Sequence, residues 1–192
     1  TERIAATATA REAADAAAAA LRDAEAHEAA LAQYRALLWQ EGVAGLEPVV
    51  REALRLIGFH VYDQKEDDVE LREPALDATI MLEIDAAEGD VGMAPHYRLR
   101  QRIEAAIQKR GAAPRGLIIV NGHRLQAPEQ RPAQAADPLR LAAETMRYCI
   151  APSSALFDAV VAHLRGDNDA VAAFRRALAT HDGYVESFTS AP

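Results

Sequence analysis

Residues 78–89, ATIMLEIDAAEG, are the stretch of sequence that decides the fold. The run over 78–85 is mostly apolar, which is typical of a β-strand inside a sheet. Glu83 and Asp85 are two positions apart, so both side chains leave the same face of this strand, about 6.6 Å apart along it. Two carboxylates on one face of a buried strand are costly unless a cation, a proton or water satisfies them. We therefore expect a functional site at this strand.

Helices and strands alternate on both sides of this segment. We expect helices over 46–57, 96–110, 154–164 and 167–178, a further helix between 138 and 148, and strands over 59–62, 69–71, 78–85, 116–120 and 148–150. The run GLIIV at 116–120 is apolar throughout, as in a central strand covered on both faces. This order predicts an α/β domain around one mixed β-sheet, which we place at residues 46–186.

Residues 1–41 have a different composition, rich in Ala and charged side chains, and residues 1–40 contain neither Gly nor Pro. Because Ala has the highest helix propensity, we expect one long N-terminal helix. A heptad register links Ala14, Ala17, Leu21, Ala24, Leu31 and Leu38, with Glu28 and Arg35 at two further core positions. This pattern favours a coiled coil that forms a homodimer or docks a protein partner. A helix packed against its own domain is the alternative.

Charge and cysteine content exclude several classes of protein. The 192 residues include 21 Lys and Arg against 29 Asp and Glu, a formal net charge of −8. This acidity argues against a broad nucleic-acid surface, although it leaves room for a local basic groove. A single Cys excludes an internal disulfide framework and suits a cytoplasmic location. No apolar run reaches the ~18 to 20 residues of a membrane span, and the Ala- and Arg-rich composition suggests a bacterial source.

Six segments of the chain occur in the order and spacing of one superfamily: LEPVVREALRLIGF, EDDVEL, MLEIDAAEG, HYRLRQRIEAAI, RGLIIVNGHR and YCIAPSSALFDAVVAHL. Residues 46–164 resemble the restriction-endonuclease-like, or PD-(D/E)xK, superfamily of metal-dependent nuclease folds, so the expected fold is a mixed β-sheet flanked by helices. The resemblance implies that Asp68 and Glu83 hold Mg²⁺ or Mn²⁺ and that Glu47 completes the site. It further implies that Arg98 and Arg124 contact phosphate.

The chain departs from the family pattern at three positions, one of which is Ala86, where relatives usually have a Gly. Asp85 stands where active relatives have a Lys that orients or deprotonates the attacking water, and Leu99 stands where relatives have a Gln after Arg98. Leu99 also belongs to an apolar helical stripe with Ile103, Ala106 and Ile107, which indicates that this face has become part of the core.

With Asp in place of the Lys, the site has a formal cluster of four carboxylates. They are Glu47, Asp68, Glu83 and Asp85, and one Mg²⁺ would neutralise only half of their charge. The remaining charge would repel a phosphodiester. We therefore expect a nuclease fold with a degenerate site that acts as a binding or regulatory module. The alternative is an active Mg²⁺- or Mn²⁺-dependent endonuclease using Asp68, Glu83 and Asp85, because two-metal chemistry does not require the Lys.

Simpler interpretations of the same residues remain open. Glu47 fits a first-turn acid stabilised by the helix dipole, and Asp68 fits a turn residue. Glu83 and Asp85 would face water if their strand lay at a sheet edge. Cys149, on a short apolar strand, fits a buried structural thiol. A sensor that binds a small ligand in the old cleft is a third functional class.

Overall fold

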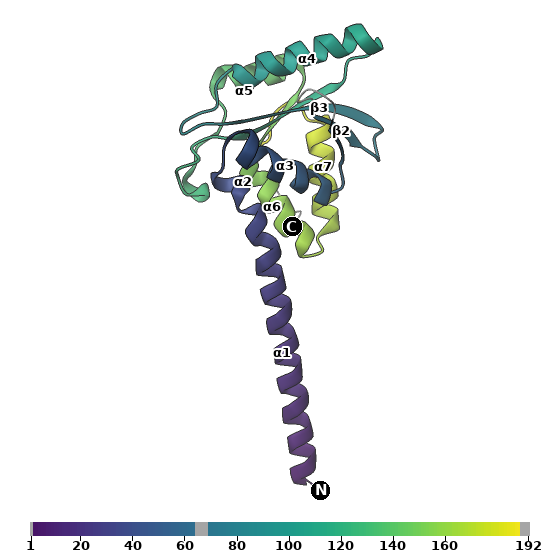
Figure 1. The fold of residues 1–192 in the computed structure, drawn as a ribbon, viewed down its shortest axis with the longest axis vertical. Helices are drawn as coiled ribbons and strands as arrows, with labels where there is room; N and C mark the ends of the chain where they lie inside the picture. The colour runs from purple at the N-terminus through teal and green to yellow at the C-terminus, as the bar shows by residue number, and fades with distance from the viewer. Residues whose placement is uncertain (1, 64–68, 189–192) are drawn as a thin grey trace. The chain divides into compact units, whose positions relative to one another are not determined.

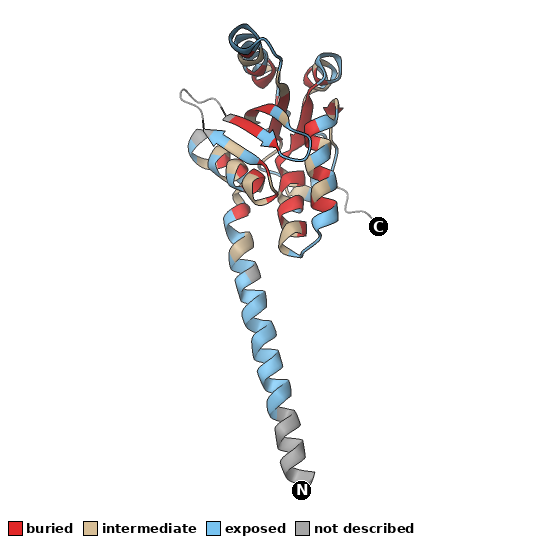
Figure 2. Cartoon of the chain, turned by 90° about the vertical axis from the view of Figure 1, so that its right-hand side faces the viewer, coloured by how far each residue is buried: buried red, intermediate tan, exposed pale blue. Residues whose placement is uncertain are grey.

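The computed structural model describes residues 2–63 and 69–188. The chain divides into two compact units, residues 1–33 and residues 34–192. All but the last residue of helix α1 (Glu2–Tyr34) belongs to the first unit, and residues 11–26 of this helix are all exposed, as Figure 2 shows. The expected long N-terminal helix is therefore present.

The second unit is an α/β domain whose elements follow one another in the expected alternation. They are α2 (Ala36–Trp39), a π-helical turn (Gly42–Leu46), α3 (Glu47–Leu56), β1 (His60–Asp63), β2 (Val69–Glu73), β3 (Ala78–Ala86), α4 (Ala94–Arg110), β4 (Arg115–Asn121), a 3₁₀ turn (Pro128–Gln130), α5 (Asp137–Met146), β5 (Cys149–Pro152), α6 (Ser153–Leu164), α7 (Asn168–Thr180) and β6 (Gly183–Tyr184). Among the described helices, none combines the length and apolar character needed to cross a bilayer.

The six strands form one mixed sheet in the order β1-β2-β3-β4-β5-β6. Strands β1, β2 and β3 are antiparallel neighbours, whereas β3, β4, β5 and β6 run parallel. Strand β3 is therefore an interior strand, hydrogen-bonded to β2 on one side and to β4 on the other. The possibility that its acids face water at a sheet edge is thus excluded.

Helices cover both faces of the sheet (Figure 1). Helices α4 and α5 pack on one face, where Met81 of β3 and Ile118 of β4 join Leu99 and Leu139 in a buried cluster. Helices α3, α6 and α7 cover the other face. The run Leu117–Val120 of β4 is completely buried, as expected for a central strand between two helical layers.

The second unit begins at Tyr34, before residue 46, where the sequence predicted the α/β domain to start. Tyr34 and Leu37 are 6% and 0% exposed, so the segment around α2 belongs to the core of this unit. Gly42, with a φ of 71°, opens the π-helical turn that leads into α3. Glycine adopts this left-handed conformation without steric cost, which explains its use at the turn.

Candidate functional site

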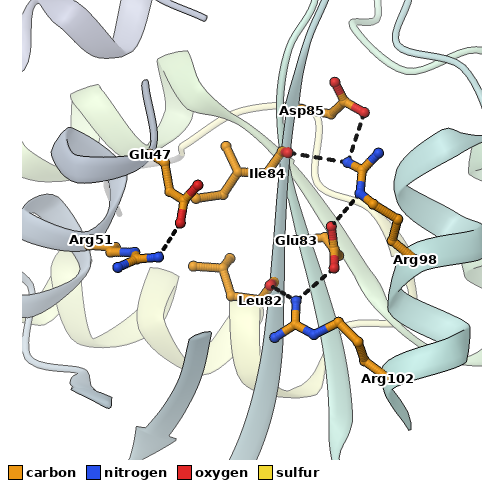
Figure 3. Close-up of polar contacts among 8 residues, drawn as sticks. All are labelled: Glu47, Arg51, Leu82, Glu83, Ile84, Asp85, Arg98 and Arg102. Carbon is orange, nitrogen blue, oxygen red and sulfur yellow. Dashed lines mark hydrogen bonds and ion pairs between the residues drawn. The ribbon is translucent and has the colours of Figure 1, made fainter. Parts of the chain in front are cut away.

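The two acids of β3 lie on the face of the sheet that α4 covers (Figure 3). Because side chains alternate along a strand, Glu83 and Asp85 point to α4, whereas Leu82 and Ile84, the residues that precede them, point to α3. Glu83 is 7% exposed. A carboxylate buried to this degree requires compensating charge or hydrogen bonds.

Two arginines of α4 supply that compensation. Arg98 donates from Nε to Oε2 of Glu83 at 2.9 Å and from Nη2 to Oδ2 of Asp85 at 3.0 Å. Arg102 donates from Nη1 to Oε1 of Glu83 at 2.6 Å and to the carbonyl oxygen of Leu82 at 2.8 Å. Both oxygens of Glu83 thus accept a charge-assisted hydrogen bond, which is the stronger kind.

Spacing explains why the two arginines converge on one carboxylate. Residues four apart on a helix lie on the same face one turn from each other, and Arg98 and Arg102 have this spacing. Burial lowers the pKa of Arg98, but its hydrogen bonds to Glu83 and Asp85 outweigh that effect, so its pKa is raised overall. Arg98 therefore stays charged and ion-paired with Glu83 and Asp85.

Glu47 lies on the opposite side of β3, at the start of α3 (Figure 3). It forms an ion pair with Arg51, one turn further along the same helix. Glu47 and Asp85 meet only at the end of β3, where both line a hollow of about 280 Å³ together with Glu41. Glu83 does not line this hollow. Glu83 and Asp85 therefore share an ion pair with Arg98. Glu47 and Asp85 share the lining of the hollow.

Asp68, the remaining acid that the resemblance implies, lies outside the described residues. Within residues 2–63 and 69–188, no three His, Cys, Asp or Glu side chains are grouped so that they could hold a metal ion. Glu47, Glu83 and Asp85 carry three negative charges, and Arg51, Arg98 and Arg102 carry three positive charges. The formal charges of these six side chains therefore sum to zero.

The second expected phosphate contact, Arg124, is also engaged with carboxylates. Its Nη2 lies 2.8 Å from Glu41 and 3.5 Å from Glu88. Its carbonyl oxygen accepts a hydrogen bond from Arg131, which also contacts Asn121 and the carbonyl oxygen of Leu38. Arg131 therefore links the loop after β4 to α2 through hydrogen bonds, and the backbone of Arg124 accepts one of them.

Sequence reasoning named Arg98 but missed the role of Arg102. The signal that could have identified Arg102 is its helical spacing from Arg98, matched to two acids on one face of the preceding strand. Leu99, between them, is 1% exposed and packs in the core as its apolar stripe predicted, but the prediction is wrong for Ile107 of the same stripe, which is 42% exposed. Cys149 is fully buried, and burial raises its thiol pKa to about 12, as expected for a structural thiol.

Comparison of the chain with protein-family models, with curated proteins and with solved structures finds no match. The chemistry of the site therefore rests on its own geometry. That geometry is an arginine–carboxylate network between an interior strand and its covering helix.

Proposed function

We propose that residues 46–186 form a restriction-endonuclease-like domain with a degenerate site, which acts as a binding or regulatory module rather than as a nuclease. The order of its elements supports this class. Helix α3, strands β2 and β3, helix α4, strand β4 and the β5–α6 unit follow one another as the six segments of the PD-(D/E)xK resemblance do.

The arginine–carboxylate network of Glu83, Asp85, Arg98 and Arg102 is the observation that carries this proposal. A divalent cation at Glu83 would have to displace two guanidinium groups that already satisfy both of its oxygens. Arg98 would have to leave both acids before it could bind phosphate. These contacts oppose both metal binding by Glu83 and phosphate binding by Arg98. The network therefore fits a structural role, in which it stabilises the packing of α4 on β3.

A cleavage assay tests this proposal directly. The full chain is incubated with linear duplex, circular duplex and single-stranded DNA, and with RNA, in Mg²⁺ and in Mn²⁺, beside its Glu83→Ala variant. We expect no cleavage by either protein. Metal-dependent cleavage by the wild type that disappears in Glu83→Ala would contradict the proposal, and cleavage by both proteins would identify a contaminant.

Helix α1 supports a role in assembly. Its described residues 11–26 are exposed, and Leu21 in the heptad register is 60% exposed. We propose that this helix pairs with a second copy as a coiled coil. Sedimentation equilibrium should show a dimer that Leu21→Lys weakens and that Ala19→Lys, outside the register, leaves intact. A monomeric wild type would contradict this assignment and favour docking to a different protein.

An active Mg²⁺- or Mn²⁺-dependent endonuclease is the second candidate function. The hollow shared by Glu47 and Asp85 favours it, because carboxylate oxygens are the ligands that these cations prefer. In this case Asp68 and Glu83 would bind metal, and Asp85 would hold a second ion or orient water. Loss of cleavage in both Asp68→Ala and Glu83→Ala would establish this candidate.

A further inference from the structure

A groove of about 530 Å³ lies between α4 and the segment that leads from α5 into β5, apart from the network of Glu83. Its apolar lining includes Leu99, Ile103, Ile107, Pro114 and Met146. Ile107 and Met146 are 42% and 50% exposed, so apolar surface remains open to solvent there. The volume falls within the usual range of small-molecule sites, about 300 to 1,000 Å³.

Gly116 of β4 lines the groove, and its lack of a side chain leaves room for two other residues of the lining. A Cβ atom at this position would lie 2.6 Å from a side-chain carbon of Leu99 and 3.0 Å from Cβ of Tyr148. Any side chain here would thus push Leu99 or Tyr148, both of which line the groove. Glycine allows helix α4 and the residue before β5 to approach β4 closely.

A buried histidine lines this groove, and one of its ring nitrogens has no hydrogen-bond partner among the described residues. His96 is 7% exposed, and its Nδ1 lies 2.9 Å from the hydroxyl oxygen of Tyr148. Burial and, to a smaller extent, Arg100 lower the pKa of His96, while burial raises that of Tyr148, so both groups are neutral near pH 7. If Tyr148 donates its proton to Nδ1, the ring proton resides on Nε2, which bonds to no residue in the described part of the chain.

Positive charge surrounds the groove. Arg100, Arg115 and Arg147 line it, and their carboxylate partners are Glu104 and Asp182. Arg115 and Arg147 share the single carboxylate of Asp182, so three guanidinium groups face two carboxylates and leave an excess of one positive charge. In a chain with a net charge of −8, this local excess favours an anion.

We propose that the groove binds a small amphiphile with one carboxylate head and an unbranched apolar body, such as a medium-chain fatty acid. The carboxylate accepts a hydrogen bond from Nε2 of His96 and faces Arg100. The apolar body covers Leu99, Ile103 and Met146. With the ring proton on Nε2, this ligand supplies an acceptor that His96 does not find among the described residues, balances the excess charge and buries the open apolar surface. The inference goes beyond the proposed function, because the nuclease-like site and its arginines take no part in it.

Calorimetric titration of the full chain with decanoate tests this inference. Decanol has the same body without the charge, and decyltrimethylammonium reverses the charge. We expect saturable one-to-one binding of decanoate, and binding at least tenfold weaker for both other probes. Failure of decanoate to bind saturably, or equal binding of decanol, would overturn the inference.

Three variants locate the site. His96→Phe removes the donor and Arg100→Glu reverses a charge on an exposed side chain, so each should weaken decanoate binding at least tenfold. Arg165→Glu makes the same charge reversal on an exposed arginine that does not line the groove, and it should leave binding unchanged. Arg100→Glu does not depend on core packing, so it keeps the test valid if His96→Phe unfolds. Unchanged decanoate affinity in Arg100→Glu would overturn the inference.

Discussion

Substitution of Glu83 by Gln distinguishes two roles for this residue, in a structural network or in a metal site. The two roles predict opposite changes in the free energy of unfolding. In the network, Glu83 pairs with Arg98 and Arg102, so loss of its charge removes one ion pair from each of these guanidinium groups beside an interior strand. In a metal site, Glu83 and Asp85 would repel each other without the ion. Removing one charge would then stabilise the metal-free protein.

The structure sets the magnitude of the expected loss. Charge-assisted hydrogen bonds contribute about 1.5 to 3 kcal/mol each. The contact of Glu83 with Arg102, whose side chain is 17% exposed, falls in that range, at about 2 kcal/mol. The contact with Arg98, whose side chain is 47% exposed, is screened by solvent and contributes about 1 kcal/mol or less. We therefore expect Glu83→Gln to lower the free energy of unfolding by about 2 to 3 kcal/mol.

Urea unfolding followed by fluorescence of Trp39 measures this difference. Trp39 is the single tryptophan of the chain and belongs to the second unit, so its signal reports on the domain that contains the network. Glu104→Gln is the matched control, because Glu104 pairs with Arg100 on the exposed side of the same helix and should contribute less than about 0.5 kcal/mol. A Glu83→Gln variant as stable as the wild type, or more stable, would refute the structural role.

Three further predictions concern the core of the same domain. Since burial lowers the pKa of His96 below 6.5, the unfolded chain binds this proton more readily. Stability should therefore fall as the pH drops below about 6.5, and a variant lacking the histidine, His96→Gln, should flatten that dependence in urea titrations. At Gly122, a Cβ atom would lie 2.4 Å from the carbonyl oxygen of Gln134, so Gly122→Ala should lower the melting temperature. Gly89→Ala is the control and should leave the melting temperature unchanged, because a Cβ atom at Gly89 would meet open space. Cys149 is fully buried with its thiol pKa raised to about 12, so it should react with a thiol reagent only at the rate of unfolding; rapid reaction in the native protein would contradict its burial.

Local sequence patterns predicted most elements of the fold. Strand β4 is a run of apolar residues buried on both faces, and α4 and α6 begin and end close to the expected residues. Strand β6 was not predicted, because two residues, Gly183 and Tyr184, carry no periodicity. The early start of the second unit was also not predicted, because the burial of Leu37 depends on residues distant in the sequence.

The candidate site was predictable only in part. The alternation of a strand placed Glu83 and Asp85 on one face, and both contact Arg98 in the structure. The partner of a charged group lies far away along the chain, so the contact of Arg102 with Glu83 required the packing angle of α4 on the sheet. The same limit applies to Glu47, whose position across β3 from Glu83 depends on which face α3 covers.

The affinity of the wild-type protein for Mn²⁺ tests the central claim most directly. Titration followed by electron paramagnetic resonance measures free Mn²⁺, and the Glu83→Gln variant provides the comparison. Because arginines already satisfy both oxygens of Glu83, the account predicts no saturable Mn²⁺ binding that depends on this residue. One equivalent of tightly bound Mn²⁺ in the wild type that is lost in Glu83→Gln would contradict it.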